Sequence, residues 1–190
     1  MLLLEGLFLF LVVCAGFSIV FYTLRTGISP MPSSRRARDS VLGLIAPESE
    51  GEILEMGSGW GTLAIPLAKR CPQATVLAYE LSPLPWLYSN LLKRLYGLKN
   101  LEFHRKDFQK IELKDASVVV TYLFPAGMEK LRRKFEKELP KNALVISHTF
   151  RVAGWRPTKE ITLPDIYHTK VYLYSFGVET WEEGSSTEKN

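Results

Sequence analysis

The sequence predicts an α/β protein in which a doubly wound, mostly parallel sheet of seven strands follows a single transmembrane helix. Three observations lead to this prediction. Apolar strand-like runs alternate with helical periodicity through the central part of the chain, a glycine-rich turn closes the first such run, and an uncharged apolar segment lies near the start. Strands that alternate with helices form a parallel sheet through right-handed crossovers. Such sheets bind ligands beyond the carboxyl ends of their strands.

Composition and patterning divide the 190 residues into four segments. We expect a transmembrane anchor at 1–25, a linker at 26–34, one α/β domain at 35–178 and an acidic flexible tail at 179–190. The charge is uneven, because residues 25–178 carry 23 Lys and Arg against 15 Asp and Glu, although the whole chain has a net charge of only +4. The two cysteines are too few for a disulfide framework and lack the spacing of a zinc site.

The apolar segment from Gly6 to Leu24 contains 19 residues and no charge. A helix of this length spans roughly 30 Å, the thickness of the hydrocarbon core of a bilayer. A cleaved signal peptide is the alternative, but Glu5 stands where such peptides carry basic residues, and no small-residue cleavage site follows. The segment therefore predicts an uncleaved membrane span.

Flanking charges predict the orientation of this span. Arg25, Arg35, Arg36 and Arg38 follow it, whereas only Glu5 precedes it. Because positive charge favours the cytoplasmic side, we expect a single-pass protein of the cell inner membrane with its α/β domain in the cytoplasm. The arginines either bind anionic lipid as well or only fix the topology, and the sequence leaves both readings open.

The expected elements of the domain follow from hydrophobic periodicity. A helix capped by Ser33 or Ser34 should run to Ile45, and three further helices should follow the first, second and fourth strands. The expected strands are Ile53–Met56, Thr75–Tyr79, Leu101–His104, Ser117–Leu123, Ala143–Ser147, Glu160–Leu163 and Lys170–Phe176, the last two as an antiparallel pair at one edge. In the helix that ends near Tyr96, a stripe formed by Leu87, Leu91, Leu92 and Leu95 is expected to be buried.

The glycine-rich turn that follows the first strand predicts a ligand site. Gly57, Gly59 and Gly61 stand at alternate positions, and glycine lets a backbone come close to a bound molecule. A dinucleotide site would need a third glycine where this chain has Thr62. Glu55 precedes the turn, where its carboxylate can hold a cationic amino group. This chemistry favours S-adenosylmethionine, which carries an ammonium and a sulfonium but no phosphate.

Two further acidic residues extend the predicted site. Glu80 ends the second strand and lies 21 residues after Gly59, where a carboxylate accepts hydrogen bonds from ribose hydroxyls. Asp107 follows the third strand, where its side chain can contact the adenine amino group with Phe108 packed on the ring. Three such features, each at the end of a strand, predict a nucleoside-containing methyl donor more strongly than the glycines alone.

These motifs resemble those of class I S-adenosylmethionine-dependent methyltransferases, which have a Rossmann-like fold. The resemblance is carried by E-M-G-S-G-W-G (Glu55–Gly61), Y-E-L-S-P (Tyr79–Pro83) and R-K-D-F (Arg105–Phe108). With P-M-P-S (Pro30–Ser33) and the late V-I-S-H-T-F (Val145–Phe150), the chain is similar to the small membrane-anchored lysine methyltransferases of the ATP synthase c-subunit and the adenine nucleotide translocase. The implied cofactor-binding residues are Glu55, Met56, Gly57, Ser58, Gly59, Gly61, Glu80, Leu81, Asp107 and Phe108.

The resemblance implies N-methylation of a lysine of a membrane-associated protein, and Tyr122 is the candidate catalytic residue. Methyl transfer from a sulfonium is an in-line displacement, so the site must hold the nucleophile and the methyl group about 3 to 3.5 Å apart. Tyr122 follows the central strand and is expected to line the acceptor pocket, with Trp60, Phe124 and Trp155 nearby. Each of these aromatic residues has packing in the core as its alternative role.

Other functions are disfavoured by the sequence or remain as alternatives. The three histidines are dispersed, so no metal site is predicted, and T-Y-L-F-P (Thr121–Pro125) replaces the N-P-P-Y motif of enzymes that methylate adenine or glutamine amides. A lipid headgroup or a small hydrophobic molecule is an alternative acceptor. A cofactor-binding or nucleic-acid-binding module without catalysis is the non-enzymatic alternative, but nucleic acid is not favoured because scattered basic residues usually form a solvated face. Those residues are Lys93, Arg94, Arg105, Lys106, Arg132 and Arg133.

Overall fold

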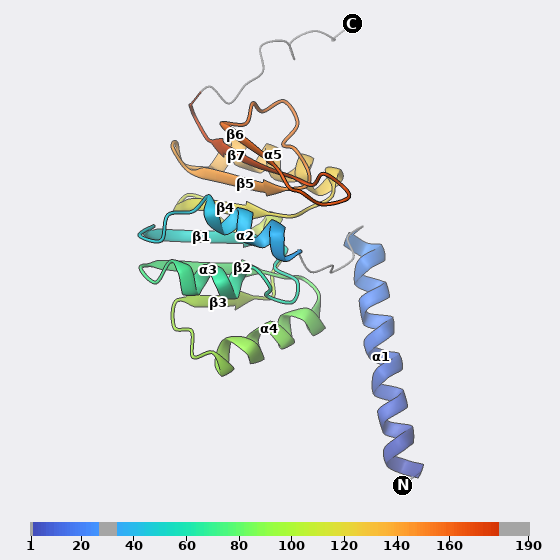
Figure 1. Cartoon of the computed structure of the whole chain (residues 1–190). Coiled ribbons are helices and arrows are strands. Elements are labelled where there is room, and N and C mark those ends of the chain that lie inside the picture. Colours follow the sequence, from blue (N-terminus) through green and yellow to red (C-terminus); the bar gives the residue numbers. More distant parts are fainter. Residues whose placement is uncertain (1, 27–33, 179–190) are drawn as a thin grey trace, which may run out of the picture.

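The computed structural model describes residues 2–26 and 34–178, which form a long N-terminal helix and an α/β body (Figure 1). Most of the predicted linker, at 27–33, and the predicted tail, at 179–190, lie outside the described residues. The body contains a seven-stranded sheet of order β3-β2-β1-β4-β5-β7-β6. The strands are β1 (Gly51–Met56), β2 (Ala74–Tyr79), β3 (Leu101–His104), β4 (Ala116–Thr121), β5 (Leu144–His148), β6 (Lys159–Thr162) and β7 (Lys170–Ser175).

The sheet confirms the predicted doubly wound topology. Strands β1 to β5 pair in parallel, whereas β7 pairs antiparallel with both β5 and β6. The order reverses between β1 and β4, because the chain first builds outward to β3 and then returns to the other side of β1. The carboxyl ends of these two strands therefore form the crevice in which ligands of such sheets bind.

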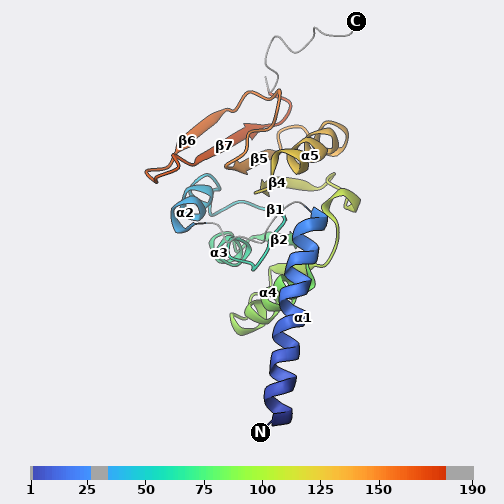
Figure 2. The ribbon, with the colours of Figure 1, turned by 90° about the vertical axis from the view of Figure 1, so that its right-hand side faces the viewer.

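Helices cover both faces of the sheet. One face carries α2 (Arg35–Gly43), α3 (Ala64–Arg70) and α4 (Pro83–Leu95), and the other carries the short 3₁₀ helix η1 (Phe108–Lys110) and α5 (Pro125–Glu138). Figure 2 shows α2 and α3 on the opposite side of the sheet from α5. Of the two predicted capping residues, Ser34 starts α2, because its Oγ accepts a hydrogen bond from Ala37 N at 3.2 Å.

The predicted buried stripe of α4 is wrong. Leu87, Leu91 and Leu95 are exposed, and only Leu92 packs partly against the core. The helix approaches β3 through other residues, because Trp86 Nε1 donates a hydrogen bond to Phe103 O at 3.0 Å. Buried Pro85 and Ser89 occupy the same side, and their small side chains allow a close approach. The leucines are therefore turned away from the sheet.

The N-terminal helix α1 (Leu2–Thr26) confirms the predicted helicity of the apolar segment. It contacts α4, and its N-terminal half projects beyond the body in both ribbon views (Figures 1 and 2). Within the described ranges, none of the helices is both long and apolar enough to cross a membrane. The transmembrane span predicted over Gly6–Leu24 is therefore not supported by the structure.

Candidate active site

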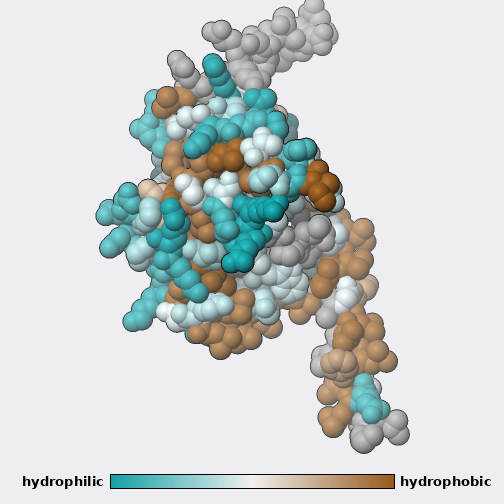
Figure 3. Space-filling model, in the orientation of Figure 1, coloured by the Kyte–Doolittle hydropathy of each residue, from teal (hydrophilic) through white to brown (hydrophobic). Residues whose placement is uncertain are grey.

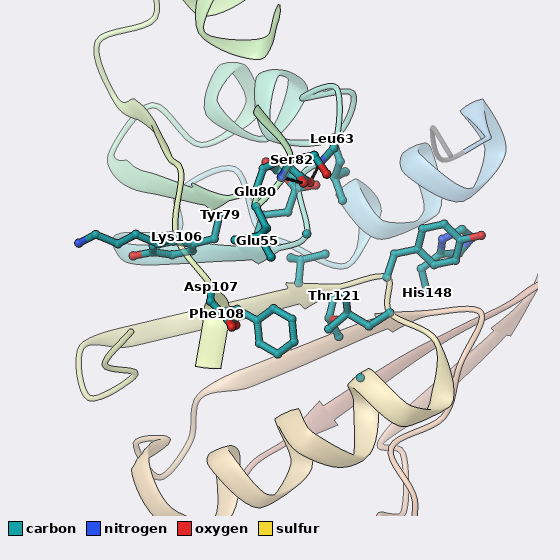
Figure 4. Close-up of a pocket in the computed structure, with 18 of the residues that line it drawn as sticks. Glu55, Leu63, Tyr79, Glu80, Ser82, Lys106, Asp107, Phe108, Thr121 and His148 are labelled. Atoms are coloured by element: carbon teal, nitrogen blue, oxygen red, sulfur yellow. Dashed lines mark hydrogen bonds between the residues drawn. The ribbon is translucent and has the colours of Figure 1, made fainter. Parts of the chain in front are cut away.

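A cavity of about 710 Å³ lies beyond the carboxyl ends of β1, β2 and β4. Figure 4 shows side chains from several elements around it, with Asp107 and Phe108 on one side and Thr121 and His148 on the other. The cavity brings together residues that are far apart in the sequence. The predicted site residues that line it are Glu55, Gly57, Ser58, Gly59, Glu80, Leu81, Asp107, Phe108 and Tyr122.

The glycine-rich turn forms one wall of this cavity. The amides of Gly57 and Ser58 both donate to Tyr79 O, at 3.0 and 2.9 Å, and so fix the turn to the end of β2. Gly59 has a φ of +52°, and no atom lies within 4 Å of the position that a Cβ would occupy there. The backbone at Gly59 thus presents an open surface on which a ligand can lie.

Two predicted site residues serve the fold around the cavity. Met56 is fully buried in the core, because β1 alternates its side chains between the two faces of the sheet. Gly61 has a φ of +73°, and a Cβ there would lie only 2.9 Å from Ser89 Cβ and from Phe103 Cζ. Gly61 therefore permits close packing of the turn against α4 and β3.

Glu80 is held by the backbone on both of its carboxylate oxygens. Oε2 accepts from Gly59 N at 2.8 Å, and Oε1 accepts from Ser82 N at 2.7 Å. Each oxygen of a carboxylate has two lone pairs, so both retain capacity for a further donor. The carboxylate is thus fixed at the cavity wall in one orientation.

Glu55 is a buried acid with unusual electrostatics. Its Oε2 has no hydrogen-bond partner among the described residues. Burial, with a smaller contribution from the charge of Glu80, raises the pKa of the Glu55 carboxyl to about 8, although a hydrogen bond from the backbone at Ala64 opposes this shift. An uncompensated buried acid of this kind marks a place where a cationic group would be stabilised.

Asp107 and Phe108 lie on a third side of the cavity. The Oδ1 atom of Asp107 accepts from Gln109 N at 2.9 Å and so caps the 3₁₀ helix η1. Phe108 packs partly against the core that β1, β4 and α5 share. The cap fixes the Asp107 side chain through one oxygen, and the short helix places Phe108 beside the predicted adenine position.

An aromatic group forms the end of the cavity beyond β4 and β5. The ring of Tyr122 lies 4.4 Å from that of His148 and 6.4 Å from that of Phe150, measured between centroids. Phe124 is partly exposed and packs on Phe150 at 5.3 Å. Trp155, which we expected nearby, is instead fully buried in the core against Phe135, Tyr174 and Phe176.

His148 was not predicted as a site residue from the sequence. This residue ends β5 and lines the cavity, and its Nδ1 has no hydrogen-bond partner among the described residues. Burial lowers the pKa of His148 to about 4, despite the opposing charge of Asp165. The imidazole is therefore neutral near pH 7. Its position at the end of a predicted strand was the available signal, but its proximity to Tyr122 depends on the pairing of β4 with β5.

The basic residues considered for nucleic acid do not form one patch. On α5, Arg132 pairs with Glu129 and Glu136, and Arg133 pairs with Glu129. These charges are largely compensated within the helix itself. Within the described part of the chain, no group of three or more His, Cys, Asp or Glu side chains is arranged to hold a metal ion.

Sequence comparison relates the chain to protein-modifying methyltransferases. The model of the ANTKMT methyltransferase domain matches residues 55–159. The mouse adenine nucleotide translocase lysine N-methyltransferase is 30% identical over 178 residues, which cover 86% of this chain and 75% of the mouse protein. A protein-lysine N-methyltransferase of Saccharolobus islandicus is 30% identical over 139 residues, or 70% of this chain and 84% of that protein.

Structural comparison supports the same fold. An RNA methyltransferase from Salinibacter ruber, solved with S-adenosyl-L-homocysteine, superposes with a TM-score of 0.71. It is 24% identical in sequence, and the match covers 84% of this chain and all of the Salinibacter chain. The seven-stranded, mostly parallel sheet is therefore a methyltransferase fold.

Proposed function

We propose that this chain, which belongs to the ANTKMT methyltransferase family and uses S-adenosylmethionine as its methyl donor, methylates a lysine side chain of a protein. Two relatives with 30% identity are named as lysine methyltransferases, which supports the choice of lysine. The observation that carries the proposal is the cavity itself. It joins the buried carboxyl of Glu55, whose Oε2 has no hydrogen-bond partner among the described residues, to the aromatic group around Tyr122 and His148.

The residues of the cavity fit the methyl donor. Glu55 would hold the ammonium of its methionine part, because a cation supplies the partner that Oε2 lacks. Glu80 would accept the ribose hydroxyls through its remaining lone pairs, and Asp107 with Phe108 would contact the adenine. When bound, the donor supplies an electrophilic methyl group on a sulfonium.

The aromatic end of the cavity suits a lysine that must lose its proton. A lysine with a pKa of about 10.4 is roughly 0.1% neutral at pH 7.4, and removal from water lowers that pKa. The rings of Tyr122 and His148 would shield the ε-amino group from water. Because His148 is neutral, its imidazole adds no opposing charge and can accept a hydrogen bond from the ammonium.

A labelling experiment tests the acceptor. Membranes from cells that lack this protein are incubated with methyl-labelled S-adenosylmethionine and the purified full chain. We expect label in a protein band, and methyl-lysine after acid hydrolysis. Label that extracts into organic solvent would instead show a lipid acceptor and contradict the proposal.

Variants of the full chain establish that the labelling depends on this cavity. Glu80→Ala removes the acceptor of the Gly59 and Ser82 amides as well as the proposed ribose contact, and should abolish both donor binding and label. Glu112→Ala is the matched control, because Glu112 is an exposed acid paired only with Lys114 among the described residues. Its binding of S-adenosylmethionine in calorimetry should equal that of the wild type.

We further propose that α1 holds the enzyme at the inner membrane, with the catalytic body on the cytoplasmic side. The support is the run of exposed apolar side chains along α1 and the group of arginines that follows it in the sequence. Fractionation of cells that express the chain tests this. The protein should sediment with the inner membrane and remain accessible to a protease added from the cytoplasmic side.

A further inference from the structure

The outward side of α4 carries an apolar surface that the fold leaves uncovered. Leu87, Leu91 and Leu95 are spaced by four residues and are 60%, 54% and 72% exposed. Tyr88 is also exposed and lines the same cavity as Leu87 and Leu91. Residues with this spacing normally form the buried stripe of a helix. We call Leu87, Tyr88, Leu91 and Leu95 the α4 outer face, and an exposed apolar surface of this kind marks an interaction site.

The α4 outer face is continuous with α1. A second cavity, of about 670 Å³, lies between the two helices and is lined by Ile19 of α1 and by Leu87 and Leu91 of α4. Tyr22 of α1 and Arg105 are joined by a hydrogen bond of 3.5 Å. Figure 3 shows hydrophobic residues along α1 and over the adjacent lower part of the body. The two helices thus present one apolar surface.

The charges of α4 indicate what covers this surface. The helix contains Lys93 and Arg94 and no acidic residue. A second copy of the chain seated on the same surface would bring these like charges together. An anionic bilayer surface instead pairs with them, accepts leucine side chains among its acyl chains and holds tyrosine at the headgroup level.

We propose that the α4 outer face, together with α1, docks on an anionic lipid surface and holds the mouth of the methyl-transfer cavity beside it. Trp60 connects the two regions, because it lines both cavities and its ring lies 5.6 Å from that of Tyr88. An acceptor lysine at the membrane surface would thus meet the cavity without leaving the membrane. Only this statement about the acceptor rests on the proposed function; the lipid contact does not.

A fluorescent probe on α4 tests the contact directly. The full chain carries Cys14→Ser, so that Leu91→Cys takes a polarity-sensitive label while buried Cys71 remains protected. On addition of vesicles of phosphatidylcholine and phosphatidylglycerol, the emission of this label should shift to the blue. The same label at Lys137→Cys, on exposed α5 across the sheet, should not respond. An unresponsive label at position 91 would overturn the proposal.

Charge substitution measures how much α4 contributes to lipid binding in addition to α1. The double variant Leu87→Asp, Leu91→Asp should bind the same vesicles at least about tenfold more weakly, since two half-exposed leucines can no longer enter the apolar layer. Arg133→Ala with Lys137→Ala makes the same change in net charge on α5 and should have a much smaller effect. Equal losses in the two double variants would mean that only net charge matters, which also overturns the proposal.

Two measurements distinguish this proposal from its alternatives. Binding of S-adenosylmethionine should be the same in both double variants as in the wild type, so a failure of vesicle binding leaves the proposed methyltransferase function intact. The Leu91 label is also followed without lipid over a range of protein concentrations. A concentration-dependent blue shift there would show that a second copy covers the α4 outer face and would overturn the lipid contact.

Discussion

Glu55 is the residue that should make donor binding depend on pH. In the free protein, its carboxyl is protonated near pH 7, because burial holds its pKa at about 8. A bound ammonium favours the ionised carboxylate, so binding of the donor should release a proton from Glu55 over this range. The Glu55 carboxyl is thus neutral in the free protein and forms an ion pair with the ammonium of the donor in the complex.

The affinity for S-adenosylmethionine should therefore depend on pH. Below pH 8 it should rise by up to about tenfold per pH unit, because the cost of ionising Glu55 falls as the pH approaches its pKa. Above about pH 8 it should fall again, since the α-amino group of the donor loses its own proton. Calorimetry in buffers of different ionisation enthalpy measures both the affinity and the proton release.

Glu55→Gln is the control for this pH dependence. Glutamine keeps the shape of the side chain but cannot ionise, so the rise in affinity towards pH 8 should disappear. The affinity at pH 8 should drop by roughly 10- to 100-fold, as expected for the loss of a charged hydrogen-bond partner of about 1.5–3 kcal/mol. An unchanged pH profile in this variant would show that the ionisation of a group other than Glu55 causes the pH dependence.

His148 should act in the methyl-transfer step and not in donor binding. We expect His148→Phe to lower kcat by roughly 10- to 100-fold with an unchanged affinity for S-adenosylmethionine, because a phenyl ring cannot accept the hydrogen bond from the lysine ammonium, a contact worth about 1.5–3 kcal/mol. Phenylalanine retains the tilted ring contact with Tyr122. His104→Phe is the matched control, because His104 ends β3, stacks on Tyr79 and pairs with Glu102. If both variants lose kcat equally, the role of His148 is structural.

At the scale of elements, the sequence predicted what depends on local pattern. Leu101–His104 has the predicted bounds of β3, and the antiparallel edge pair appears as β6 and β7, because alternation and turn residues are local signals. The prediction of which side of α4 is buried was wrong, because the spacing of its leucines shows that they share one side of the helix but not what that side packs against. His148 was missed because its neighbour Tyr122 belongs to another strand, and only the sheet order brings them together.

The turn at Gly61 should be the most sensitive to an added methyl group. Gly61→Ala should lower the free energy of unfolding by about 3 kcal/mol, because it combines a positive φ with a Cβ that would overlap Ser89 and Phe103. Gly97→Ala has a similar φ of +64° but open space around it, and should cost about 1 kcal/mol. Urea unfolding of the two variants measures the difference. Equal losses would mean that the close packing at Gly61 relaxes.

At the scale of the whole molecule, the body carries its own core. The two clusters of buried apolar residues lie on opposite faces of the sheet and, among the described residues, draw their members from position 37 onward. Among the described residues, α1 contacts the body at α4 and at Arg105. The stability of the body should therefore be independent of α1.

Removal of residues 1–26 should separate attachment from catalysis. We expect the shortened chain to melt within a few degrees of the full chain and to bind S-adenosylmethionine with the same affinity, because none of the described residues that line the cavity belongs to α1. It should also move largely from the membrane fraction to the soluble fraction. Differential scanning calorimetry and fractionation test these statements. A large drop in melting temperature would show that α1 is part of the folding unit.

The two backbone hydrogen bonds that hold Glu80 also bear on which nucleosides the site accepts. A carboxylate anchored in this way cannot turn toward a replacement donor. A 2′- or 3′-deoxy analogue would leave one carboxylate oxygen of Glu80 without the hydroxyl donor that the full ribose offers. Sites built around a hydroxyl strongly reject ligands that lack it. Discrimination between ribose and deoxyribose would then be fixed when the turn folds, before any donor arrives.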